Sequence, residues 1–131
     1  QAVNLLAPTF PKMGSAWTVF HKLPGGDLVG GSAASHLEHL GATYSRIDGK
    51  VLAGLNRRHG GLTEEVLGDA RIPADLGEHL GGGLYEREVL YMISQEWARN
   101  PDDILWRRSK AGLHMTTSEQ MQSSEKLAEL L

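Results

Sequence analysis

The chain has 131 residues with 16 acidic side chains against 13 Lys and Arg, and its formal net charge at pH 7 is −3. Its length suits one domain and its 40% apolar content suits a packed core, which excludes a disordered chain, while the missing basic excess argues against nucleic acid as a partner. The absence of cysteine excludes disulfides, thiolate metal sites and cysteine nucleophiles, and is compatible with a reducing cytoplasm.

Residues 7–31 are predicted to form an irregular arm. Three prolines and several glycines fall in this range, and they remove hydrogen-bond donors and interrupt regular structure. Structureless segments of this length are rare inside compact domains, so we expect the arm to lie against another part of a larger protein. The lack of a Met before Gln1 favours a piece of a longer chain as well. We therefore divide the chain into a linking arm, 1–31, and a helical domain, 32–131.

Helical spacing of apolar residues begins directly after the arm. The pattern predicts a first helix that is capped by Ser32 or Ser35 and runs to about Ile47. A second helix is expected to begin after its N-cap Asp48 and to end at about His59, where two glycines follow. The first part of the domain is therefore predicted to be a pair of helices.

The middle of the domain is predicted to hold two further helices. A short one has Thr63 as its cap, and Glu64 and Glu65 in its first turn oppose the positive end of the helix dipole. The strongest pattern covers 84–99, because its apolar residues recur along one helical face. These residues are Tyr85, Val89, Met92, Ile93 and Trp97. This stripe is expected to define a core together with the helices that follow it.

Two more helices are predicted near the end of the chain. Asn100, followed by a proline and two aspartates, is a helix start signal, and this helix is expected to reach about Lys110 and to be closed by Gly112. Thr116 and Glu119 form a capping box for a last helix. The sequence therefore predicts an all-α fold, a compact bundle-like domain of five or six helices after an irregular arm.

Trp106, Arg107, Arg108 and Lys110 form the densest basic cluster and are the main candidates for anion or interface contacts. An arginine pair beside a tryptophan is able to grip an anion or a partner protein. The competing hypothesis is structural, because these cations complement the negative end of their helix and Asp103 stands four residues before Arg107. The structural hypothesis is the stronger of the two.

Other candidate sites are weaker. His36 and His39 are three residues apart on a predicted helix, but a third metal ligand is lacking, so solvated helix histidines are the stronger hypothesis. Arg57 and Arg58 allow the same choice between ion pairing and an anion site. The sequence contains neither a nucleotide-binding glycine motif of the common types nor a nucleophile elbow. We therefore assign no catalytic, cofactor-binding or metal-binding residue to this chain.

Five segments have distinctive residue sequences in addition to helical spacing. They are DLGEHLGGGLYEREV at 75–89, QEWAR at 95–99, DDILWRRSKAGL at 102–113, and upstream SAWT at 15–18 and LPGGD at 23–27. The first three resemble the C-terminal region of aerobic, FAD-dependent glycerol-3-phosphate dehydrogenases. The upstream pair resembles the segment that joins the flavin-binding body of those enzymes to a helical C-terminal domain. The resemblance implies a parent enzyme that oxidises sn-glycerol 3-phosphate to dihydroxyacetone phosphate, reduces FAD and passes electrons to membrane quinone.

The same resemblance implies where the chemistry lies. The FAD and substrate sites of that family belong to the N-terminal body, which is then the partner of this domain, and the domain itself is structural and non-catalytic. The parent is expected to be cytoplasmic and peripheral to the cytoplasmic membrane. The sequence leaves open whether the domain associates weakly with itself. The alternative is a stand-alone helical interaction module whose Trp and Arg residues bind a protein partner.

Overall fold

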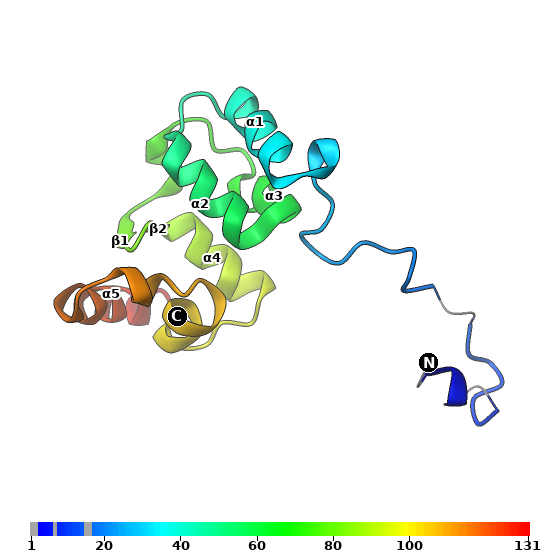
Figure 1. Cartoon of the computed structure of the whole chain (residues 1–131). Helices are drawn as coiled ribbons and strands as arrows, with labels where there is room; N and C mark the ends of the chain where they lie inside the picture. The colour runs from blue at the N-terminus through cyan, green and yellow to red at the C-terminus, as the bar shows by residue number, and fades with distance from the viewer. Residues whose placement is uncertain (1–2, 7, 15–16) are drawn as a thin grey trace.

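The computed structural model describes residues 3–6, 8–14 and 17–131, which contain five α-helices (Figure 1). The helices are α1 (Ala33–Thr43), α2 (Gly49–His59), α3 (Thr63–Leu67), α4 (Glu86–Gln95) and α5 (Thr117–Leu130). An antiparallel hairpin precedes α4 and consists of β1 (His79–Gly81) and β2 (Leu84–Tyr85). Short 3-10 and π turns connect these elements. The all-α fold class is thereby confirmed.

Three predicted helix starts are confirmed by their N-cap hydrogen bonds. The Ser32 hydroxyl accepts the backbone N–H three residues later at 3.1 Å, and the Asp48 carboxylate accepts the N–H two residues later at 2.7 Å. Thr116 and Glu119 make the reciprocal bonds of a capping box at the start of α5. Each cap satisfies a backbone donor that the helix itself leaves unpaired.

Two details of the first three helices differ from the prediction. α1 ends before Tyr44 and Ile47, and their helical spacing reflects burial, since both side chains are 5% exposed in the turn that follows. Thr63 is not the N-cap of α3, because Leu62 occupies that position. The Thr63 hydroxyl instead donates to the carbonyl oxygen of Gly60 at 2.7 Å, and this bond stabilises the turn that precedes α3.

The helix predicted over 84–99 is shorter at both ends, because α4 covers Glu86–Gln95. Leu84 and Tyr85, the first two residues of the predicted helix, belong to β2, since a turn of three glycines, all with positive φ, folds the chain back on itself. At the other end Trp97 has φ +58°, which leaves the helical region and places 76% of the residue in solvent. Val89 and Met92 are fully buried as predicted, whereas Trp97 is not part of the stripe.

The helix that Asn100 opens follows the prediction at its start and departs from it at its end. The Asn100 side chain accepts the N–H of Asp103 at 3.0 Å, as expected of a cap. The last turns, Asp103–Arg108, are π-helical, and the chain leaves them through Lys110 in the left-handed region at φ +58°. Gly112 therefore does not close this helix; it lies in a following 3-10 turn beneath the ring of Trp106.

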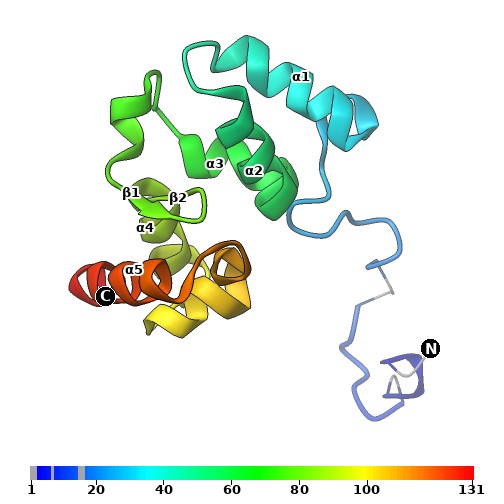
Figure 2. The ribbon, with the colours of Figure 1, turned by 60° about the vertical axis from the view of Figure 1, so that its left-hand side comes forward.

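Two hydrophobic clusters form the core, and α4 lies between them (Figures 1 and 2). The α1–α3 cluster contains Leu40, Tyr44, Ile47, Leu52, Leu55, Val66, Leu67, Ala70 and Leu76. The α4–α5 cluster contains Leu80, Leu84, Val89, Met92, Ala98, Ile104, Leu105, Ala111, Met115 and Leu127. On α4, Tyr91 packs against the first cluster, together with Tyr85 of β2, while Val89 and Met92 belong to the second. The two faces of α4 thus serve different clusters.

The arm has the predicted irregular character in its described residues, and it leads away from the helical body (Figure 1). Its root is held by backbone packing: the N–H of Gly61 donates to the carbonyl oxygen of Gly25 at 2.8 Å. A Cβ at Gly25 would lie 2.7 Å from the carbonyl oxygen of His59, so only glycine allows this approach. Several apolar side chains before the root are more than half exposed. They are Leu5, Phe10, Trp17, Val19, Phe20 and Leu23.

We expect the substitution Gly112→Ala to lower the free energy of unfolding by about 1–3 kcal/mol. The added Cβ would lie 2.6 Å from the Cη2 atom of Trp106. The double variant Gly112→Ala with Trp106→Ala should lose less stability than the sum of the two single changes, because the removed ring makes room for the methyl group. Urea denaturation measures these free energies.

Gly41→Ala in α1 is the matched control, since nothing lies within 4 Å of its added Cβ. This change should leave stability unchanged or raise it slightly, because alanine favours a helix interior more than glycine does. Equal effects at Gly41 and Gly112 would contradict the packing described for Trp106.

Candidate functional site

The basic cluster predicted from the sequence is largely engaged in internal contacts. Asp103 forms the predicted ion pair with Arg107 and accepts the backbone N–H of Arg99 at 2.9 Å. These two bonds, the Arg99 amide first, hold the pKa of the Asp103 carboxyl below its usual range. Arg108 donates through Nε to the carbonyl oxygen of Glu96 at 3.0 Å, beside the last turn of α4. Arg108 therefore joins the π-helical segment to the preceding chain, whereas the pair of Arg107 with Asp103 lies within that segment.

Trp106 and Lys110 retain part of their surface. Trp106 is 39% exposed, and one side of its ring covers Gly112. Lys110 is exposed, and no salt bridge to its ammonium group occurs among the described residues. An anion or interface contact at Trp106, Arg107, Arg108 and Lys110 stays a prediction, with two of its four members already paired.

A buried ionic cluster at the centre of the domain was not predicted from the sequence. Glu88 on α4 has a side chain that is 1% exposed, and it receives two bonds from Arg58, from Nε at 2.6 Å and from Nη2 at 2.7 Å. His59 Nε2 lies 2.7 Å from the same carboxylate, and its Nδ1 lies 3.7 Å from Glu96. The second Arg58 nitrogen also donates to the carbonyl oxygen of Gly83 at 3.2 Å.

Three separate elements meet at this carboxylate. Arg58 and His59 end α2, Glu88 lies in the first turn of α4, and Gly83 belongs to the hairpin turn. Burial by itself raises the pKa of the Glu88 carboxyl, but the bonds and charges of His59 and Arg58 outweigh it, so the pKa lies below its usual value. The cluster therefore holds α2, α4 and the hairpin together with an ionised acid.

One sequence signal for this cluster existed. Glu88 stands one residue before Val89 and four before Met92, on the apolar face of the α4 pattern. A charged residue on such a face is almost never buried without a partner. Its partner lies 30 residues away in the chain, at Arg58, and only the fold shows which cation is used.

His36 and His39 do not lie as the solvated pair that the sequence favoured. His36 is 1% exposed; its Nδ1 accepts the N–H of Val29 at 3.4 Å, so Nε2 carries the proton and donates to the carbonyl oxygen of Gly60 at 3.2 Å. His39 is partly exposed and faces Glu64 at 3.3 Å. The solvated interpretation is therefore wrong for His36. Within the described chain, no three His, Asp or Glu side chains are grouped as metal ligands.

The glycine-rich hairpin turn does not fit a dinucleotide. A Cβ at Gly81 would lie 2.8 Å from Ser123, and one at Gly82 would lie 2.7 Å from Met115, so side chains already cover this backbone. The first turn of α4 that follows carries Glu86, whose negative charge opposes a pyrophosphate. The described residues therefore offer no cradle for FAD at this turn. No helix in the described part of the chain is long and apolar enough to cross a membrane.

The fold and its contacts define a helical domain whose buried charges join its own elements. Residues 17–131 match the family described as the C-terminal domain of alpha-glycerophosphate oxidase. The chain belongs to this family. This match confirms the family resemblance of residues 75–89, 95–99 and 102–113.

Similar curated proteins include two kinds of dehydrogenase. A glycerol-3-phosphate dehydrogenase from Pseudomonas aeruginosa is 41% identical over 126 residues, which are 96% of this chain and 24% of that protein. The aerobic glycerol-3-phosphate dehydrogenase of Escherichia coli is 34% identical over 128 residues, 98% of this chain and 25% of its own length. A D-erythritol 1-phosphate dehydrogenase from Brucella abortus is 34% identical over 119 residues, 91% of this chain and 24% of that protein. The chain spans about a quarter of the length of these relatives.

We expect Glu88→Gln to lower the free energy of unfolding at pH 7 by about 3 kcal/mol, because Arg58 then stays buried without its counter-charge. The pKa of Glu88 is depressed in the folded state, so the stability it contributes is present above about pH 4.5, the ordinary pKa of a glutamate, and is lost as pH falls further. The difference between the wild type and the variant should therefore shrink below that pH, where Glu88 takes up a proton.

Urea denaturation of both proteins at neutral and acidic pH measures this difference. Glu129→Gln on α5 is the control, because Glu129 is exposed, and it should change stability by less than about 0.5 kcal/mol at either pH. A Glu88→Gln variant as stable as the wild type at pH 7 would show that the ionic cluster does not hold the helices together.

Proposed function

We propose that this chain is the C-terminal domain of an FAD-dependent glycerol-3-phosphate dehydrogenase. In this proposal the parent oxidises sn-glycerol 3-phosphate to dihydroxyacetone phosphate and transfers the electrons through FAD to membrane quinone. The observation that carries the proposal is the 41% identity to a glycerol-3-phosphate dehydrogenase over 96% of the chain. Identity at this level over almost the whole domain supports a shared architecture of the parent as well.

The domain itself has a structural role in this proposal. The Glu88 carboxylate, its most buried acid, is occupied by Arg58 and His59, and the glycine-rich turn is covered by side chains. Such groups stabilise a fold and leave the chemistry to the rest of the polypeptide. FAD and substrate then belong to an N-terminal body, and the arm, 1–31, links that body to the helical domain. The parent is cytoplasmic and peripheral to the membrane in this proposal, and the domain self-associates weakly if at all.

A second candidate concerns the substrate. The relative from Brucella abortus is named for D-erythritol 1-phosphate, and its identity to this chain, 34%, equals that of the Escherichia coli enzyme. The domain does not discriminate between these two polyol phosphates, since its described contacts serve its own packing. The higher identity to the Pseudomonas aeruginosa protein favours glycerol 3-phosphate. A stand-alone interaction module is the remaining alternative.

The test uses the full-length protein that contains this domain. We expect it to be purified with bound FAD, seen as flavin absorbance, and to reduce a soluble quinone analogue when glycerol 3-phosphate is added. D-erythritol 1-phosphate, tested in parallel, should give a lower kcat/KM. A preference for the erythritol phosphate would select the second candidate, and a full-length protein without flavin would refute both in favour of the interaction module.

A further inference from the structure

Trp97 is the most exposed of the three tryptophans and has an unusual backbone conformation. It is 76% exposed, compared with 59% for Trp17 and 39% for Trp106. Its φ of +58° lies in the left-handed region, where a bulky side chain is an outlier. Glycine is the usual residue at this position after a helix. The fold therefore carries a large apolar ring where a smaller residue would suit the backbone better.

The turn that holds Trp97 is tightly fixed. The carbonyl oxygen of Met92 accepts the N–H groups of both Glu96 and Ala98, each at 3.1 Å, so one carbonyl of the last turn of α4 holds the chain on both sides of Trp97. Ala98 is fully buried in the α4–α5 cluster, and Arg108 holds the carbonyl oxygen of Glu96. These contacts direct the ring outward. The packing of this domain does not require the indole, since most of it lies in solvent.

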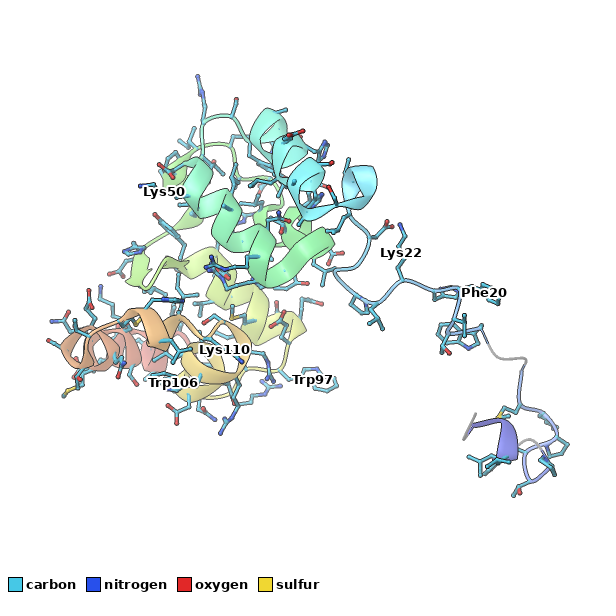
Figure 3. The ribbon with its side chains drawn as sticks, in the orientation of Figure 1. Phe20, Lys22, Lys50, Trp97, Trp106 and Lys110 are labelled. Atoms are coloured by element: carbon cyan, nitrogen blue, oxygen red, sulfur yellow. The ribbon has the colours of Figure 1, made fainter. Side chains whose placement is uncertain are left out.

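The Trp97 turn and the root of the arm lie on either side of one residue, His59. Its ring faces Glu96, the neighbour of Trp97, with Nδ1 3.7 Å from the carboxylate. Its carbonyl oxygen lies against Gly25 at the arm root. Figure 3 shows Trp97 projecting from the side on which the arm leaves the body. Leu23 and Phe20, just before the root, are 81% and 88% exposed.

We propose that Trp97 and arm residues 17–23 form one docking surface for the flavin-binding body of the same polypeptide. This inference rests on the proposed function. In the relatives about three quarters of the polypeptide lies outside the matched region, and the family is described as a C-terminal domain, so that portion joins through the arm. A tethered body is present at high effective concentration, and a buried indole in an apolar pocket is a common anchor of such an interface.

The direct test is hydroxyl-radical footprinting of the full-length protein, which reports the solvent access of single side chains. Trp97 should react several-fold more slowly than a tryptophan with 76% of its surface free. Leu113 is the internal control: it is 70% exposed and lies in the turn after the π-helical segment, and it should keep the reactivity of an exposed leucine. Trp97 reacting as a free ring would overturn the proposal.

A variant tests the same surface without damage to the fold. Trp97→Gly suits the positive φ, so the domain should fold as before, and in the full-length protein the arm should lose part of its contact with the body. Hydrogen exchange of residues 17–23 should then become several-fold faster, whereas Leu113→Ala should leave it unchanged. Unchanged exchange of the arm in Trp97→Gly would overturn the proposal.

Other occupants give different results. Protection of Trp97 that is lost on dilution would assign the surface to a second copy of the chain, and protection that needs added phosphatidylglycerol vesicles would assign it to lipid; each result overturns the proposal. The flavin absorbance of the same sample separates the two hypotheses. FAD-containing protein with an unprotected Trp97 overturns the docking surface and leaves the proposed function standing, whereas protein without flavin refutes the proposed function itself.

Discussion

The buried carboxylate of Glu88 is the contact on which the arrangement of the helices depends. Each hydrophobic cluster packs on a different face of α4, so apolar burial alone does not fix the angle between the two. The bonds from Arg58 and His59 do, because a guanidinium that donates two bonds to one carboxylate allows little rotation. Loss of one partner leaves the other charge buried, which costs more than most single changes in a core.

The same cluster connects the helical core to the two exposed features of the domain. His59 contributes its ring to Glu88 and Glu96 and its carbonyl oxygen to the packing of Gly25. The end of α4 and the root of the arm are consequently held at fixed positions relative to α2. For the proposed docking of Trp97 and the arm, such rigidity is favourable, because pre-ordered groups lose little conformational entropy on binding.

The features that the sequence predicted correctly are those that depend on contacts between residues close together in the chain. Ser32, Asp48 and Thr116 cap their helices through bonds within three residues, and each was found from a short pattern. Trp97 matched the helical spacing of the stripe and yet left it, because the chain must turn there to bury Ala98. The ionic cluster joins residues about 30 positions apart, and no periodicity reports such a pair. The assignment of the basic residues to structural pairing holds for Arg58, Arg107 and Arg108. Of these three, only Arg107 uses a partner that sequence spacing suggested, Asp103.

Native-state hydrogen exchange tests most directly whether Glu88 makes the two clusters one cooperative unit. The slowest amides of α2, such as Leu55, and of α4, such as Met92, should exchange with the same opening free energy, and denaturant should lower both in parallel. Opening of α1–α3 at a clearly lower free energy than α4 and α5 would contradict this account, because the two clusters would then be stable independently of the carboxylate between them.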